Sequence, residues 1–300
     1  MSRILANVWL DSAAEQAAAF YTATLPQTRV TATIRYPEAG REIHGGTPGS
    51  VMTIDLDVAG FGLTLLNGGP LVRPNPSISF FCSFASVAEI DRAWAALSDG
   101  GAIHMELDTY PWSERYGWVS DRYGVSWQLI LDSAVRPRVF PSLLFVGARC
   151  GQAEPALRLY ASVFRNAQVG EIARYGANQA PDREGTVVYG QLQLEGQQLV
   201  AMDSAGDHDF GFTAGVSLIV DAATQEQIDY YWSSLSAVPE SEQCGWLKDR
   251  YGVSWQVCPV AEMNRLLSLS DRAAVNRAME AMLAMKKLDI AALHAAAQGR

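Results

Sequence analysis

The stretch GWVSDRYGVSWQ spans residues 117–128, and residues 245–256 read GWLKDRYGVSWQ. Ten of the twelve positions are identical, which indicates an internal duplication. Weaker matches extend the repeat towards the N-terminus, where Tyr21 aligns with Tyr160. The chain of 300 residues therefore contains two copies of one domain.

The spacing between the copies is not constant. It is 139 residues at Tyr21 and 138 at Trp94, but 128 in the quoted stretch. Each change marks an insertion or deletion, and such changes concentrate in surface loops. We therefore expect loops at 37–48, 61–78 and 95–116.

Each copy shows a finer repeat of secondary structure. Residues 4–10 have the pattern of a strand, and residues 12–24 that of a helix with Ser12 as its N-cap. Three further strand patterns follow, separated by Gly and Pro. The same order begins again at residue 78. The sequence thus predicts an α+β protein with four βαβββ units, two in each copy.

The predicted domains are residues 1–135 and 136–260. Residues 261–300 are rich in Ala, Leu and Met, and we expect a helical tail there with Ser270 as an N-cap. The tail carries an apolar stripe of Val, Ala and Met side chains. This stripe either packs on the two domains or a partner subunit, or lines a Met-rich ligand groove.

Composition excludes several classes of protein. Hydrophobic residues make up 49% of the chain and charged residues 18%, as in soluble globular proteins. The net charge of −9 disfavours nucleic acid and anionic membrane surfaces as partners. Four scattered cysteines form no disulfide framework and no CxxC pair. Residues 1–21 lack the uninterrupted apolar run of a signal peptide, so we expect a cytoplasmic protein.

The paired βαβββ units, the phrase DRYGVSWQ after a strand, and the helix ending in Phe20 and Tyr21 resemble the vicinal oxygen chelate (glyoxalase) superfamily. The resemblance covers about residues 2–260. Within the superfamily, the chain looks like the PhnB-like branch, which is often labelled 3-demethylubiquinone-9 3-methyltransferase. It implies that two units curl into an open barrel around a cavity. Members of the superfamily include isomerases, lyases, dioxygenases and antibiotic-sequestering proteins.

The resemblance also implies a divalent metal held by His, Glu or Gln side chains from facing strands. The corresponding positions in this chain are Ala6 or Asn7, Ser77 or Ser79 and Gln128 in the first copy, and Ser142 or Leu143, Gly215 or Ser217 and Gln256 in the second. None of these is a histidine or a carboxylate, and an amide is a neutral, weaker ligand. We therefore predict no metal site of the usual kind and no cofactor. A divalent metal held by other ligands is the alternative.

Five polar side chains are candidates for ligand binding: Gln128, Gln256, Ser79, Ser217 and Asn67. Strand alternation places Gln128 on the face opposite Trp127. The two glutamines either offer hydrogen bonds to a ligand or are satisfied by neighbouring groups.

His208 and Asp203 are the candidates for catalysis, because a carboxylate near an imidazole can orient it and raise its pKa. Asp121 and Asp249 belong to the repeated stretch and are expected to cap turns. No Gly-rich loop follows a strand in the manner of a nucleotide-like cofactor site, so methyl transfer is not expected.

Two functions therefore remain open. The first is a protein that binds a small molecule in a barrel cavity without the usual metal. The second is an enzyme of the vicinal oxygen chelate type that uses His208 or an atypical metal. In either case the two copies are expected to form an internal pseudo-dimer, and the tail offers a possible surface for a homodimer.

Overall fold

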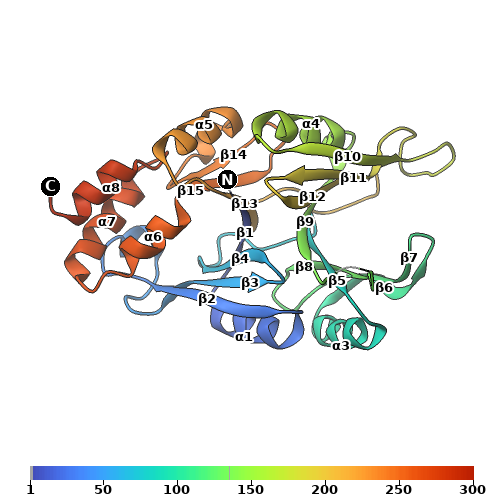
Figure 1. Ribbon diagram of the computed structural model, residues 1–300, viewed down its shortest axis with the longest axis horizontal. Coiled ribbons are helices and arrows are strands. Elements are labelled where there is room, and N and C mark those ends of the chain that lie inside the picture. The colour runs from blue at the N-terminus through green and yellow to red at the C-terminus, as the bar shows by residue number, and fades with distance from the viewer. Residues whose placement is uncertain (1–2, 135) are drawn as a thin grey trace.

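The computed structural model describes residues 3–134 and 136–300. The first copy contains two successive units of strands and one main helix (Figure 1). Unit 1 comprises β1 (Arg3–Leu10), α1 (Ala14–Thr24), β2 (Thr28–Arg35), the short α2 (Arg41–His44), β3 (Val51–Val58) and β4 (Phe61–Asn67). Unit 2 comprises β5 (Ile78–Phe84), α3 (Val87–Ser98), β6 (Ala102–Tyr110), β7 (Ser113–Ser120) and β8 (Ser126–Leu131).

The second copy repeats this order and is followed by three helices. Unit 3 comprises β9 (Val139–Phe145), the 3-10 helix η1 (Gly147–Arg149), α4 (Ala153–Val163), β10 (Gln168–Arg174), β11 (Val187–Leu194) and β12 (Gln197–Asp203). Unit 4 comprises β13 (Val216–Asp221), α5 (Gln225–Leu235), the 3-10 helix η2 (Pro239–Ser241), β14 (Trp246–Lys248) and β15 (Ser254–Cys258). The tail comprises α6 (Val260–Leu267), α7 (Arg272–Ala284) and α8 (Ile290–Ala297).

The strands form two sheets, and each sheet joins one unit from each copy. Sheet A has the order β14-β15-β13-β1-β4-β3-β2, and sheet B has the order β10-β11-β12-β9-β5-β8-β7-β6. The duplicated α+β fold and its helical tail are thus confirmed. The two units of a copy, however, lie in different sheets, so each curved sheet is completed by the other copy.

The exchange is reciprocal. Strand β1 pairs with β13 in sheet A, and β5 pairs with β9 in sheet B, both antiparallel. Asn7 lies opposite Ser217 in the first pair, and Ser79 lies opposite Ser142 in the second. Ser217 is the repeat equivalent of Ser79, and Ser142 that of Asn7, so the two sheets have the same pairing at their centres.

The fourth unit has one strand fewer than the second. The second copy is ten residues shorter between its Trp232 and Trp246 than the first is between Trp94 and Trp118. The prediction of a loop over 95–116 was wrong, because the additional residues form β6 and the start of β7. In unit 4 the 3-10 helix η2 occupies the corresponding part of the chain.

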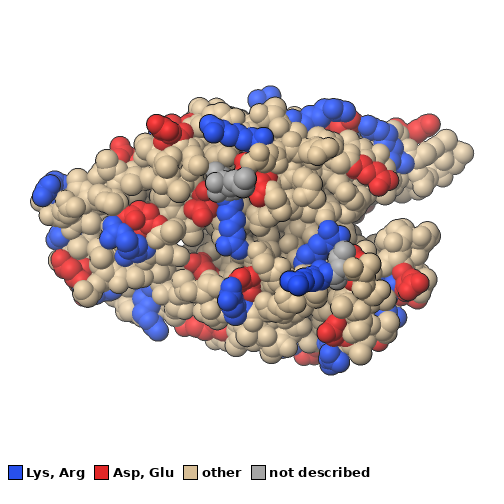
Figure 2. Space-filling model, in the orientation of Figure 1, with Lys and Arg blue, Asp and Glu red and all other residues tan. Residues whose placement is uncertain are grey.

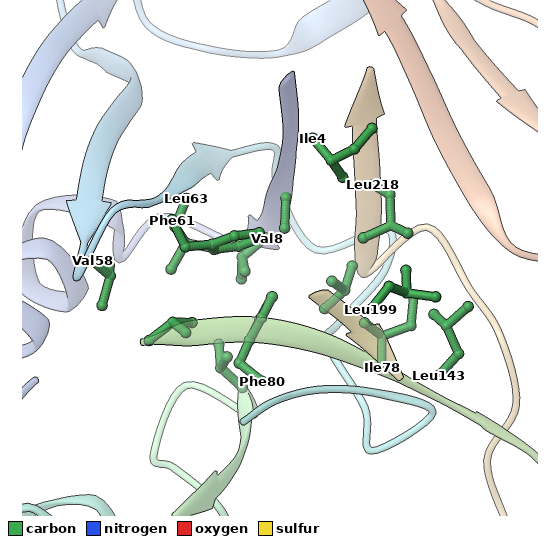
Figure 3. Packing of buried hydrophobic residues seen from close by; sticks show 14 of the residues in the cluster. Ile4, Val8, Val58, Phe61, Leu63, Ile78, Phe80, Leu143, Leu199 and Leu218 are labelled. Atoms are coloured by element: carbon green, nitrogen blue, oxygen red, sulfur yellow. The ribbon is translucent and has the colours of Figure 1, made fainter. Parts of the chain in front are cut away.

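The inner faces of both sheets pack on the helices α1, α3, α4 and α5 and on each other. Figure 3 shows Ile4, Phe61 and Leu218 of sheet A facing Phe80 and Leu199 of sheet B. Alternate residues along β1 and β5 enter this core, as strand periodicity requires. Each sheet consequently has an outer face that points away from the other sheet.

Two buried hydrogen-bond clusters tie the units of each copy together. Asp121 accepts hydrogen bonds from Tyr21 Oη at 2.7 Å and from Trp127 Nε1 at 2.9 Å, besides two backbone N–H groups. Asp249 accepts the equivalent bonds from Tyr160 and Trp255. The prediction that these aspartates cap turns is confirmed, and each also joins a helix of one unit to a strand of the next.

Helix starts differ in detail from the predictions. Ala13, not Ser12, is the N-cap of α1, and the N–H of Ala14 donates instead to Asn67 Oδ1 at 2.8 Å. Asp271 replaces Ser270 as the N-cap of α7 and accepts two backbone N–H bonds. In both cases a side chain that reaches the first turn accepts the free N–H groups.

The tail packs on sheet A. Val275, Ala278 and Met279 of α7 are buried in a cluster with Ile34 of β2. The prediction that the apolar stripe packs on the two domains is therefore confirmed. None of the helices among the described residues is both long and apolar enough to cross a membrane.

Candidate functional site

The outer face of sheet B forms a cleft. Its walls are two arms, the β10–β11 hairpin and the β6–β7 hairpin (Figure 1), and Figure 2 shows the molecular surface hollowed between them. We call this the sheet B cleft. Its apolar lining is separate from the main core and consists of Phe81, Tyr116, Phe140 and Val200, with Met105, Tyr110, Trp118, Ile130, Tyr189 and Met202 packed against them.

Aromatic rings dominate this lining. Phe81 stacks on Phe140 with ring centroids 5.1 Å apart, and the edge of Tyr189 meets Phe81 at 6.0 Å. Tyr116 continues the array towards the tip of the β6–β7 arm, where Trp112 is 60% exposed. Aromatic contacts therefore run from solvent to the floor of the cleft.

The floor is polar and buried. Gln128 donates from Nε2 to Ser79 Oγ at 2.7 Å and accepts from Tyr116 Oη at 2.6 Å. Ser142 lies opposite Ser79 in the sheet and is fully buried. Its Oγ has no hydrogen-bond partner among the described residues. A buried hydroxyl without a partner is costly, and this makes Ser142 a natural contact for a bound molecule.

Four of the five predicted binding residues form two equivalent polar floors, one in each sheet. Gln128 and Ser79 meet in sheet B, and Gln256 and Ser217 meet in sheet A at 3.0 Å. Both glutamines lie opposite the core tryptophans, as strand alternation predicted. Asn67, in contrast, bonds the backbone of Ala14 and Val51 and supports the start of α1.

The proposed catalytic pair is not assembled. Asp203 Oδ1 accepts the N–H groups of Gly151 and Ala153, and its Oδ2 accepts that of Val187. His208 Nε2 instead lies 2.9 Å from Ser204 Oγ. Asp203 thus occupies the position equivalent to Asn67 and, like it, supports the start of a helix.

Another histidine lies near His208. His104 on β6 bonds Ser120 Oγ through Nε2 at 2.8 Å and packs on Trp118. Burial lowers the pKa of His104, and the positive charge of His208 lowers the same pKa further. Both rings therefore belong to one region, although they come from different copies.

The floor does not suit a divalent metal. Its donors are the hydroxyls of Ser79 and Ser142 and the amide of Gln128, and that amide already bonds its neighbours. None of these groups carries the negative charge that Zn²⁺, Mg²⁺ or Ca²⁺ sites supply. Among residues 3–134 and 136–300, no three His, Cys, Asp or Glu side chains are placed to hold an ion together.

Comparisons with known proteins agree with this architecture. A sequence profile described as 3-demethylubiquinone-9 3-methyltransferase matches residues 2–130 and again residues 137–258. The chain belongs to this family. The double match confirms that both copies are PhnB-like and that the fold is that of the vicinal oxygen chelate proteins.

Two solved structures are similar to this chain. A putative 3-demethylubiquinone-9 3-methyltransferase, the PhnB protein of Bacillus cereus, is 31% identical over 43% of this chain and 98% of its own, with a TM-score of 0.39. Glyoxalase I from Zea mays is 12% identical, but covers 90% of this chain and 97% of its own with a TM-score of 0.53. This second likeness shows the fold alone. No curated protein matches the chain.

Sequence reasoning missed the aromatic lining of this family member's cleft. Phe81 is two residues beyond Ser79 and therefore shares its face, and Phe140 precedes Ser142 by the same interval. Strand alternation alone would have placed these two rings beside the polar floor. The place of Tyr189 could not be predicted in this way, because the exchange of units between the sheets brings this residue to the cleft from the second copy.

Proposed function

We propose that this chain binds a flat, largely apolar small molecule with a hydrogen-bonding group in the sheet B cleft, without a metal ion. The observation that carries the proposal is the aromatic lining beside the unpartnered hydroxyl of Ser142. Apolar walls with a few polar groups at the floor are typical of small-molecule sites.

The two parts of the cleft have separate roles. Rings on opposite walls provide faces and edges on which a planar molecule can stack, each contact contributing about 0.5–1.5 kcal/mol beyond area burial. Ser142 supplies a donor or an acceptor, and Ser79 and Gln128 fix the floor around it. Stacking therefore supplies affinity, whereas the floor sets orientation.

Methyl transfer is not part of this proposal. Gly60 and Gly196 serve turns between strands. No strand in the described part of the chain is followed into its helix by the G-x-G-x-x-G turn that a nucleotide-like cofactor uses. The His208 hypothesis also loses support, because Asp203 is bonded to backbone N–H groups.

Binding can be tested with 8-anilinonaphthalene-1-sulfonate, a fluorescent probe with a flat naphthalene ring and a sulfonate acceptor. Phe81→Leu removes a ring from the cleft and should weaken binding roughly 2- to 10-fold. The matched control is Ile219→Leu, because Ile219 is the equivalent residue of sheet A. Equal effects of the two substitutions, or no binding at all, would contradict the proposal.

Metal content provides an independent test. Protein purified without chelators is expected to contain well under one divalent ion per chain by elemental analysis, because the donors of the floor are neutral and the amide of Gln128 already has partners. One ion per chain that is lost on Gln128→Ala would show that the family's metal has been retained with atypical ligands.

A further inference from the structure

The two outer faces are not equally open, although their polar floors are equivalent. In sheet B the edge of β7 is covered by β6. In sheet A the equivalent strand is missing, and the edge at β14 is covered by the tail. The N–H groups of Cys244 and Gly245 donate to the carbonyls of Met285 and Lys286 at 2.8 and 2.7 Å. The tail thus satisfies the part of this edge just before β14, whereas Lys248 within β14 accepts a bond from Ala237.

The tail also reaches the opposite arm of sheet A. Asn264 of α6 donates to Asp55 of β3 at 2.9 Å, and Asn276 of α7 accepts the N–H of Glu38 at 3.1 Å. Figure 1 shows α6, α7 and α8 between the β2–β3 side and the β14–β15 side of sheet A. The same helices therefore connect both arms of this sheet.

This connection is closely packed. Val275, Ala278 and Leu293 are fully buried, and Leu288 is 1% exposed. Ion pairs at the surface join Lys286 to Glu242 and Lys287 to Asp229. Such exposed pairs contribute little, so the apolar cluster supplies most of the attachment.

A polar floor remains on the face that the tail spans. Gln256 donates to Ser217, and Asn7 lies beside Ser217 in the sheet. Asn7 is only 3% exposed, and its Nδ2 has no hydrogen-bond partner among the described residues. The equivalent atom in sheet B is Ser142 Oγ, which shares this property. A buried donor of this kind suits a ligand with a carbonyl, carboxylate or sulfonate oxygen.

The array of Phe81, Phe140 and Tyr116, however, is not repeated in sheet A. The positions equivalent to Phe81, Phe140 and Tyr116 are Ile219, Leu5 and Cys244. The outer face of sheet A has instead Trp9 and Trp246, with ring centroids 6.0 Å apart. The two floors have therefore kept the same polar geometry while their surroundings have diverged.

We propose that the helical tail closes a second ligand site, with Asn7, Ser217 and Gln256 as its floor, so that the intact chain binds one ligand. This inference rests on the proposed function, because the one ligand expected on the intact chain is the molecule bound in the sheet B cleft. The tail takes the place of the missing strand and bridges the arms. Once the tail is displaced, the buried donor Asn7 Nδ2 suits a ligand with a hydrogen-bond acceptor.

The test compares the intact chain with Val275→Asp, which places an unpaired charge in the cluster between the tail and sheet A. Ala273→Asp adds the same charge on the exposed side of α7 and is the matched control. Native mass spectrometry with 8-anilinonaphthalene-1-sulfonate should show one bound probe for the intact chain and for Ala273→Asp, but two for Val275→Asp. Adding Asn7→Ala to Val275→Asp should remove the second probe, whereas adding Ser142→Ala should weaken the first.

The reactivity of a cysteine thiol shows whether the tail covers sheet A, and this measurement needs no bound ligand. Cys258 packs in the tail cluster, whereas Cys82 is fully buried in the main core. Val275→Asp should raise the rate of Cys258 labelling by 5,5′-dithiobis(2-nitrobenzoate) at least about tenfold and leave Cys82 protected, which shows that the core stays folded.

The outcomes separate the two proposals. Two probes on the intact chain, or one probe on Val275→Asp despite a reactive Cys258, would overturn the closed site and leave the sheet B cleft standing. Equal Cys258 rates in the intact chain and Val275→Asp would also overturn closure. No probe on the intact chain but one on Val275→Asp would overturn the sheet B cleft and support the closed site, whereas no probe on either would overturn both.

Discussion

At the scale of single residues, the repeated aspartates carry more of the structure than their place in a turn suggests. Asp121 is 4% exposed and accepts four hydrogen bonds. Burial raises its pKa, while the bonds from Tyr21 and Trp127 act in the opposite direction. Losing one donor leaves a buried carboxyl oxygen with fewer partners, which is costly.

Tyr21→Phe and Tyr160→Phe are therefore expected to lower the free energy of unfolding by about 1–3 kcal/mol each. The two should behave alike, because Asp121 and Asp249 have the same partners. Urea unfolding followed by circular dichroism measures the change. The control is Tyr230→Phe, which removes a single, partly buried hydrogen bond to the Val163 carbonyl from a tyrosine that is 40% exposed. A loss as large in this control would contradict the explanation.

At the scale of elements, equivalent helices of the two copies start differently. Thr224 and Gln227 form a complete capping box at the start of α5. At the same place in unit 2, Ser86 bonds the side chain of Glu89 and makes no cap bond to the helix α3. The same helix can thus begin with or without a side-chain cap.

Thr224→Ala should consequently lower the free energy of unfolding by about 1 kcal/mol, since N-cap removal has this cost. Ser86→Ala is the matched variant and should cost clearly less, because its hydroxyl satisfies no N–H of the first turn. Thermal unfolding of both variants checks the difference. A larger loss for Ser86→Ala would show that the capping geometry does not govern these helices.

The polar floor and the aromatic lining also belong to this scale. Strand periodicity predicted that Gln128 lies on the face opposite Trp127, and the bond from Gln128 to Ser79, away from the core, agrees with this. Strand periodicity could not predict that the side chains of Asn67 and Asp203 accept backbone N–H groups at the starts of α1 and α4. Those contacts depend on how closely a strand end approaches the following helix in three dimensions.

At the scale of the whole molecule, neither copy is a complete structural unit. Strands β1 and β5 of the first copy pair with β13 and β9 of the second. A separated first copy therefore exposes two strand edges along the apolar centre of the fold. Such exposed edges pair readily with the strands of another chain.

Residues 1–135 expressed alone are accordingly expected to form a homodimer, in which β1 of one subunit pairs with β5 of the other. Light scattering after size-exclusion chromatography measures the mass, with the full chain at the same concentration as the reference. A folded monomer at micromolar concentration would contradict the exchange of units.

The sequence alone determined the duplication, the four units, the helical tail and the place of each Gln on the strand face opposite its Trp. These follow from local periodicity and from an internal repeat, which are properties of the chain itself. Only the tertiary structure decided which units share a sheet, which outer face the tail spans, and that Phe81, Tyr116 and Tyr189 meet in one cleft. Strand pairing between distant segments depends on packing of the whole chain, so no local pattern specifies it.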